Sequence, residues 1–132
     1  MYNAEGYPEP TAGVALARVA RNEKARRLVY ICSPYAGDTE HNIRRARGYC
    51  RFAVCKGHIP LACHLLFPQF LAEMDREERE LGLSFALVLL GLCDEVWVFG
   101  SRVSVGMAQE ISQAKQRGMP IRYFTEQCEE VM

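Results

Sequence analysis

The stretch Glu95-Val-Trp-Val-Phe-Gly-Ser-Arg-Val-Ser-Val-Gly-Met-Ala-Gln-Glu110 passes from an apolar run into a helix-like pattern. Residues 96–99 are apolar and rich in β-formers, and Gly100 closes the run. Short continuous apolar runs of this kind are typical of strands buried on both faces of a parallel sheet. Ser104 then predicts a helix start, because its hydroxyl can accept a hydrogen bond from a free backbone N–H group. Met107 stands where a capping box has Glu or Gln, so only half of that signal is present.

The helix predicted after Ser104 buries one face and ends at Gly118 and Pro120. Its inward face is formed by apolar residues at helical spacing, Met107, Ile111 and Ala114. Glu110 comes directly before Ile111, so we expect it at the edge of the buried face. Parallel α/β sheets bind ligands at the carboxyl ends of their strands, and helix starts there favour anions. Glu110 is therefore either a functional carboxylate or a solvated surface acid.

A second strand, loop and helix lie earlier in the chain. Leu28–Cys32 is a strong strand pattern, and it breaks into the small-residue loop Ser33–Asp38. The helix that follows is predicted over Thr39–Lys56 and stopped by Gly57. Asn42 lies in its first turns, from where its side chain can reach back to the loop. A strand that enters such a loop and then a helix is a common place for a phosphate or ribose site.

The remaining segments complete an alternating pattern. His58–Cys63 predicts a short strand, and a proline within it favours the edge of the sheet. Residues 64–71 then leave the carboxyl end of the sheet. Residues 73–80 are highly charged and predict an exposed helix or lid, whereas residues 83–92 are apolar nearly all round and predict a helix packed beneath other elements. Residues 120–125 give the last strand.

This order, β-α-β-α-α-β-α-β, predicts an α/β fold. We expect a small Rossmann- or flavodoxin-like parallel sheet of four to five strands, flanked by helices. The domain is predicted to span residues 27–125. Residues 1–26 form an N-terminal extension whose basic part, residues 14–27, predicts a short helix, and residues 126–132 form a C-terminal tail.

Composition narrows the functional class. The 132 residues have sixteen Lys and Arg against sixteen Asp and Glu, a formal net charge of zero. This balance argues against binding to nucleic acid or to a membrane surface, and the basic N-terminal run lacks interleaved aromatic residues. Cysteines lie in apolar strand and helix patterns, which favours reduced thiols in a cytoplasmic protein. No run approaches the roughly eighteen apolar residues that span a bilayer, and the N-terminus has no apolar signal core.

Three motifs carry a family resemblance. The strand Val29-Tyr-Ile-Cys32, the loop Ser33-Pro-Tyr-Ala-Gly-Asp38 and the helix start Ser104-Val-Gly-Met-Ala-Gln-Glu110 resemble the nucleoside 2-deoxyribosyltransferases and the related 2'-deoxynucleoside 5'-monophosphate N-glycosidases. The resemblance covers roughly residues 28–124. Within that superfamily it is strongest to short bacterial and phage proteins that carry the SPYAGD loop, with His64-Leu-Leu-Phe-Pro68 and Asp94-Glu-Val-Trp-Val-Phe-Gly100 as further shared patterns.

The resemblance implies roles for individual residues. Glu110 stands in the place of the family's nucleophile, and Tyr30 matches the strand tyrosine that holds the nucleophile's carboxylate. Ser104 matches the residue that touches the 5'-phosphate in the monophosphate branch, where transferases of free nucleosides tend to carry Asp. The implied substrate is a nucleoside or nucleotide, with no cofactor and no metal, and the implied assembly is a homo-oligomer. The expected substrate-binding residues are Ser33, Pro34, Tyr35, Gly37, Asp38, Asn42, His64, Ser104, Gly106 and Met107.

The chain also departs from the family pattern. Ala86 aligns with the Asp that assists protonation of the leaving base, and the first loop lacks the glycine-serine start and the arginine of the monophosphate branch. Candidates for the proton donor are His64, Asp38 and three acids of the charged segment, Asp75, Glu77 and Glu78. Water or a second base can resolve the glycosyl-enzyme, so hydrolase and transferase both remain open.

Two other interpretations compete with an N-glycosidase. The first is a non-catalytic nucleotide-binding module that keeps the cradle of Ser33, Gly37 and Ser104, and Ala86 favours it. The second is a metal site formed by a group of Cys and His, although the spacing matches no common zinc pattern. Its members would be Cys55, His58, Cys63 and His64.

Overall fold

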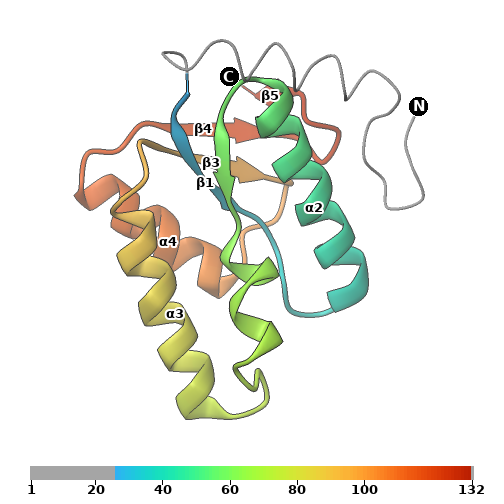
Figure 1. The fold of residues 1–132 in the computed structure, drawn as a ribbon, viewed down its shortest axis with the longest axis vertical. Coiled ribbons are helices and arrows are strands. Elements are labelled where there is room, and N and C mark those ends of the chain that lie inside the picture. The colour runs from blue at the N-terminus through green and yellow to red at the C-terminus, as the bar shows by residue number, and fades with distance from the viewer. Residues whose placement is uncertain (1–25, 132) are drawn as a thin grey trace.

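A computed structural model describes residues 26–131 of the chain. Its elements are five strands and three α-helices, with two short 3-10 helices between β2 and α3 (Figure 1). In chain order they are β1 (Leu28–Cys32), α2 (Thr39–Cys55), β2 (Ile59–Leu61), η2 (Cys63–Leu65), η3 (Phe67–Gln69), α3 (Arg76–Leu90), β3 (Glu95–Phe99), α4 (Val105–Gln116), β4 (Ile121–Phe124) and β5 (Glu130–Val131). Most of the N-terminal extension, including residues 14–25 of the expected basic helix, lies outside the described residues.

The strands form one sheet in the order β2-β1-β3-β4-β5. The first four are parallel, and β5 pairs antiparallel with β4. This is the flavodoxin-like strand order, and the predicted α/β fold class is confirmed. The short strand with a proline, β2, lies at the sheet edge as expected. Residues 126–132, expected as a tail, contain β5 and so extend the sheet.

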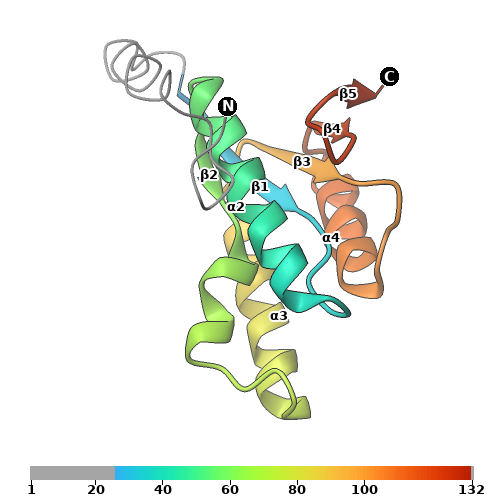
Figure 2. The same cartoon turned by 90° about the vertical axis from the view of Figure 1, so that its right-hand side faces the viewer.

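Helices cover both faces of the sheet (Figures 1 and 2). Alternating side chains of the two central strands separate the core into two halves, because successive residues of a strand point to opposite faces. On one face α2 packs against Val29, Ile31, Trp97 and Phe99. On the other face α3 and α4 pack against Tyr30, Cys32, Val96 and Val98.

One helix expectation is wrong. Residues 73–80 and 83–92 do not form separate elements, because a single helix, α3, runs from Arg76 to Leu90, with Asp75 as its N-cap. The apolar part of α3 is also not covered all round. Only Ala86 and Leu90 of this helix are buried, since one face alone meets the sheet and α4.

All six cysteines are free thiols in this structure. Among residues 26–131, no helix is long and apolar enough to cross a membrane.

Candidate functional site

The strand order has its switch point between β1 and β3, where the direction in which strands are added to the sheet reverses. These strands are neighbours, with Tyr30 opposite Val96 and Cys32 opposite Val98. The connection after β1 leads to one edge of the sheet and the connection after β3 leads to the other. Open α/β sheets bind ligands in the crevice that such a switch point creates outside the carboxyl ends of the strands.

Helix α4 begins beside this switch point. Gly100 ends β3 with φ of +98°, a conformation that glycine adopts without steric cost. Ser104 is the N-cap, as predicted, and its hydroxyl accepts a hydrogen bond from the Met107 N–H at 3.2 Å. The helix then runs back over the sheet and carries Glu110 on its second turn.

Glu110 is a buried carboxylate, with only 3% of its surface exposed. The Tyr30 hydroxyl donates a hydrogen bond to its Oε2 atom. The Cys32 thiol donates a longer hydrogen bond to Oε1, with a distance of 3.6 Å between Sγ and Oε1. Glu110 is therefore not at the edge of the buried face, and it is not a solvated surface acid. Tyr30 and Cys32 meet it because they are two residues apart on β1 and face α4 together.

Burial raises the pKa of Glu110 to about 7, while the hydrogen bonds from Tyr30 and Cys32 act in the opposite direction. Burial and the nearby Glu110 charge raise the pKa values of Tyr30 and Cys32. Both groups therefore stay protonated at neutral pH and serve Glu110 as donors. A proton leaves or enters this site most easily at Glu110, near pH 7.

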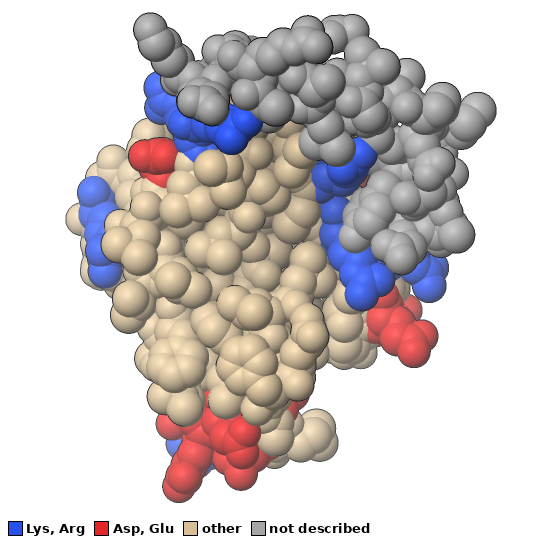
Figure 3. Space-filling view, in the orientation of Figure 1, with Lys and Arg blue, Asp and Glu red and all other residues tan. Residues whose placement is uncertain are grey.

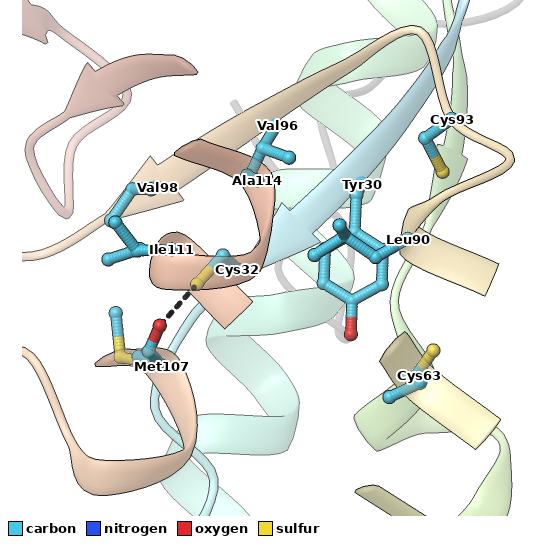
Figure 4. Close-up of a cluster of buried hydrophobic side chains, with 11 residues drawn as sticks. Tyr30, Cys32, Cys63, Leu90, Cys93, Val96, Val98, Met107, Ile111 and Ala114 are labelled. Atoms are coloured by element: carbon cyan, nitrogen blue, oxygen red, sulfur yellow. Dashed lines mark hydrogen bonds between the residues drawn. The ribbon is translucent and has the colours of Figure 1, made fainter. Parts of the chain in front are cut away.

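Two cysteines that the motif analysis did not assign to the site lie next to this pair. The Cys32 thiol is also directed at the Met107 carbonyl, at 3.9 Å (Figure 4). Cys63 is near the Tyr30 hydroxyl, and its pKa is raised by burial to about 11. Strand periodicity was the available signal for Cys32, since a residue two positions after Tyr30 faces the same side. Cys63 comes from the turn after β2, for which the sequence gives no such signal.

The loop after β1 is held by the helix that follows it. The Asn42 side-chain amide donates to the Tyr35 and Ala36 carbonyls at 3.0 and 3.1 Å, so the reach expected of Asn42 is present. Asp38 is the N-cap of α2 and accepts from the His41 N–H at 3.3 Å. Gly37 has φ of +98°, which allows the turn between these two anchors.

His64 joins the η2 segment to this loop. Its Nε2 atom lies 3.0 Å from the Ser33 carbonyl, which can only accept, so Nε2 carries the proton. The ring stacks on Tyr35 with centroids 5.0 Å apart. Burial lowers the pKa of His64, which keeps the ring neutral. The Ser33 hydroxyl is buried and has no hydrogen-bond partner among the described residues.

The other expected residues surround this centre more loosely. Pro34 and Tyr35 are half-buried, Ser104 and Gly106 are exposed, and Met107 is buried. Of the proton-donor candidates, Asp75 and Glu78 accept hydrogen bonds from backbone N–H groups around the start of α3. The acid whose charge reaches Tyr35 is Glu73, which the motifs did not single out; together with burial, it raises the pKa of Tyr35. Ala86, at the position of the family's Asp, packs in the core between the helices and the sheet.

No group of three His, Cys, Asp or Glu side chains that could hold a metal ion occurs within residues 26–131, so the proposed Cys and His cluster does not form. Two surface cavities lie on the α2 side of the sheet. One is lined by Trp97, Arg122 and Phe124, and the other by Tyr49, Glu126 and Cys128 among others. Neither is lined by Glu110, whose side chain is only 3% exposed and is therefore covered in the present conformation.

Fold and site together define a doubly wound α/β protein with a buried, hydrogen-bonded carboxylate at its switch point. The sequence model of the family described as "Domain of unknown function (DUF7768)" matches residues 27–124, and the chain belongs to this family.

Among solved structures, the chain is similar to a 2-deoxyribosyltransferase from the psychrotolerant bacterium Bacillus psychrosaccharolyticus. The TM-score is 0.58 at 18% sequence identity, over 74% of this chain and 72% of the other. At that identity the likeness establishes the fold. No curated protein matches the sequence.

Proposed function

We propose that this protein breaks the N-glycosidic bond of a nucleoside, a deoxynucleoside or a 5'-monophosphate of either, with Glu110 as the nucleophile. The sugar is then released to water or transferred to a second base. The observation that carries the proposal is the pair of hydrogen bonds from Tyr30 and Cys32 to a buried Glu110 at the switch point. The shared fold with a protein named as a 2-deoxyribosyltransferase supports the same reaction class. The sequence motifs that resemble this superfamily are the ones that carry the three residues.

The chemistry requires a carboxylate beside C1' of the sugar. As the C–N bond breaks, its electron pair leaves with the base and positive charge develops on C1' and the ring oxygen. A Glu110 oxygen forms the new bond to C1', and water or a second base later displaces it. Tyr30 and Cys32 hold the carboxylate in place and stabilise its ionised form, which is the nucleophilic one.

The departing base needs a proton, and Ala86 supplies none. His64 is a weak candidate, because its ring is neutral and its Nε2 proton faces the Ser33 carbonyl. Asp38 accepts a backbone hydrogen bond as a helix cap. We assign the role instead to an acid of the segment before α3, with Glu73 first, since its charge already reaches Tyr35 in the loop.

The substrate must also reach Glu110. The β1 loop, the His64 segment and the start of α4 all follow the carboxyl ends of parallel strands, where such folds bind ligands, so these are the proposed substrate contacts. They are Ser33, Pro34, Tyr35, Gly37, Asp38, Asn42, His64, Ser104, Gly106 and Met107. Ser104 favours a phosphorylated ligand, because its N–H neighbours at the helix start attract anions.

A second candidate is a nucleotide-binding module without catalysis. Two observations favour it, the absence of an acid at Ala86 and the burial of Glu110. Such a protein would keep the loop and the helix start as a ligand cradle and use Glu110 only as a buried hydrogen-bond acceptor.

The test is incubation with a panel of nucleosides and their 5'-monophosphates, with and without an acceptor base, followed by chromatography of free and exchanged base. Glu110→Gln abolishes base release if Glu110 is the nucleophile. The matched control is Glu95→Gln, which also removes a buried carboxylate but at the amino end of β3, where the Trp97 indole N–H donates to it. Ligand-dependent thermal stabilisation with no base release from the wild type supports the binding module instead.

A further inference from the structure

A groove runs along α2, on the face of the sheet opposite Glu110. Its volume is about 630 Å³, within the range of about 300–1,000 Å³ that is usual for ligand sites. One wall is a single face of α2, whose residues recur at three- and four-residue spacing, and the other wall is the turn between β4 and β5. The α2 wall includes Arg44, Arg45, Gly48, Tyr49 and Phe52, and the turn contributes Glu126, Gln127 and Cys128. We refer to this feature as the α2 groove.

One end of the α2 groove is positively charged. Arg44 and Arg45 lie there, and neither has an ion pair within residues 26–131. The Arg45 guanidinium instead donates a hydrogen bond to the Glu126 carbonyl at 3.4 Å, which holds it against the turn. Figure 3 shows Lys and Arg side chains gathered on the right of the molecule, over α2. Two neighbouring guanidinium groups match the oxygens of a phosphate.

Gly48 leaves the middle of the α2 groove open. It lies inside a helix of 17 residues, where glycine is less favourable than alanine because it loses more conformational freedom on folding. Packing does not require a glycine here, since an added Cβ would meet no described atom within 4 Å. The missing side chain therefore widens the groove between the arginines and Phe52 at a cost to the helix.

Tyr49 contributes a hydroxyl to the same groove. Only 3% of the tyrosine surface is exposed, and its ring stacks on Phe99 with centroids 4.1 Å apart. Burial raises the pKa of the hydroxyl to about 12, and the charges of two groove residues, Arg45 and Glu126, act on it in opposite directions. The hydroxyl forms no hydrogen bond with any residue that the structure describes. A protonated hydroxyl held in this way can bond to a bound ligand.

The other end of the α2 groove is apolar. The half-buried Phe52 ring lies there and meets the Phe124 ring edge-on, with centroids 5.4 Å apart. The β4–β5 turn adds Cys128, whose φ of +64° is uncommon for a residue other than glycine or asparagine and is typical of ligand-binding turns. Arg44 and Phe52 are eight residues apart, which is roughly 12 Å along a helix. A ligand that reaches both ends is therefore about as long as a mononucleotide.

We propose that the α2 groove is a second ligand site, which binds an organic phosphate that carries a flat ring. The two arginines hold the phosphate through charge-assisted hydrogen bonds. The ring lies over Gly48 and extends toward Phe52, where it covers apolar surface. Glu126, the only acid among the described residues that line the groove, accepts hydrogen bonds from hydroxyl or amino groups of the ligand. Because the sheet separates the groove from Glu110, this inference does not depend on the proposed reaction.

The first test is an NMR titration of the isotope-labelled protein with two probes, adenosine 5'-monophosphate and phenyl phosphate. At least one of them is expected to shift the amide signals of Gly48 and Gln127, and the tighter one identifies the ligand as a nucleotide or an aryl phosphate. Inorganic phosphate and adenosine are expected to bind the groove at least about tenfold more weakly than the tighter probe, because each fills only one end. Groove signals that shift with neither probe overturn the proposal, as does inorganic phosphate that binds equally tightly.

Substitutions on α2 provide the second test. Gly48→Leu fills the middle of the groove and is expected to weaken binding at least about tenfold, while the melting temperature holds or rises because leucine favours a helix and the space is open. Arg44→Ala changes an exposed helix position and is expected to weaken binding about tenfold with the fold intact. Arg47→Ala is the control, an exposed arginine of the same helix that is not among the described residues lining the groove. Unchanged affinity in Gly48→Leu or Arg44→Ala, or an equal loss in Arg47→Ala, overturns the proposal.

Discussion

The Tyr30 hydroxyl donates a hydrogen bond to the Glu110 carboxylate across eighty positions of sequence, in the interior between β1 and α4. A buried acid without partners would be costly, and here two donors on one strand satisfy it. The arrangement keeps an ionisable group inside the protein with a pKa near neutrality. Groups tuned in this way are concentrated at functional sites, which is why the pair deserves direct tests.

Tyr30→Phe removes the hydrogen bond and leaves the ring. The bond lowers the Glu110 pKa, so its loss moves the acidic limb of the pH–rate profile to higher pH. Base release at pH 7 is expected to fall about 10- to 100-fold, because less carboxylate is ionised and its position is less restrained. Tyr49→Phe is the matched control, a buried tyrosine on the opposite face that stacks on Phe99. An unshifted limb in Tyr30→Phe would contradict the assigned role.

Glu110→Gln is expected to stabilise the protein at alkaline pH. Burial raises the Glu110 pKa from 4.5 to about 7, so the folded state holds a proton that the unfolded state releases. Below pH 4.5 the carboxyl is protonated in both states, and folding stability falls as the pH rises from there to about 7. The full loss is at most about 3 kcal/mol. Urea denaturation at pH 5 and pH 8 should show the advantage of Glu110→Gln growing with pH. Equal effects at both pH values would mean that the acid is not perturbed.

The two central strands were predictable from sequence because continuous apolar runs bounded by small residues are local signals. Strand β5 was not, because it is two residues long and exists through its pairing with Tyr123 and Phe124. Its turn contains Cys128 at φ of +64°. Glycine or asparagine is the usual residue in that conformation and would have indicated a turn in the sequence, whereas cysteine does not. The apolar character of α3 was visible, but periodicity does not say which of its faces the chain's own core covers.

The candidate site was predictable only in part, and for a similar reason. The motifs brought Glu110 and Tyr30 together through resemblance, since no local pattern links positions so far apart. The burial of Glu110 was missed because helical spacing places a residue next to Ile111 near the edge of the apolar face. How much of the Glu110 side chain is covered depends on its contacts with β1, which the spacing does not show. The His64 contact with Ser33 joins η2 to the loop after β1, and such contacts follow from the turn after β2 and not from composition.

Ser33→Ala tests whether the β1 loop binds a ligand. The Ser33 hydroxyl is buried and makes no hydrogen bond with any described residue, so its removal is expected to leave the melting temperature within about 2 °C of the wild type. Nucleotide affinity measured by calorimetry is expected to fall about tenfold, because the substitution removes a hydroxyl whose expected hydrogen-bond partner is the bound ligand. Ser84→Ala, at an exposed position of α3, is the control. Lost stability with unchanged affinity would assign the hydroxyl to the fold.

Asn42→Ala tests the anchoring of the same loop. The Asn42 amide holds the Tyr35 and Ala36 carbonyls, and its loss frees the loop that bears the proposed contacts. We expect KM to rise about tenfold with little change in kcat, since Glu110 and Tyr30 are untouched. His41→Ala, at the adjacent and exposed position, keeps the anchor and serves as the control. A fall in kcat at constant KM would place Asn42 in the chemical step instead.

Ser104→Asp separates phosphorylated from free ligands. Ser104 caps α4 through the Met107 N–H, and aspartate caps helices as well as serine does, so folding stability is expected to stay within about 0.5 kcal/mol. The added charge repels a 5'-phosphate at the helix start, whereas a free nucleoside is unaffected. Affinity for monophosphates is expected to fall more than tenfold, with nucleoside affinity unchanged. Ser112→Asp, exposed on the same helix beyond the first turn, is the control for added charge. Ser104→Asp keeps the helix cap, so a general loss of folding does not explain a change in affinity. Equal losses of affinity for monophosphates and for nucleosides would show that Ser104 does not lie at the phosphate position and that the binding mode is that of a free nucleoside.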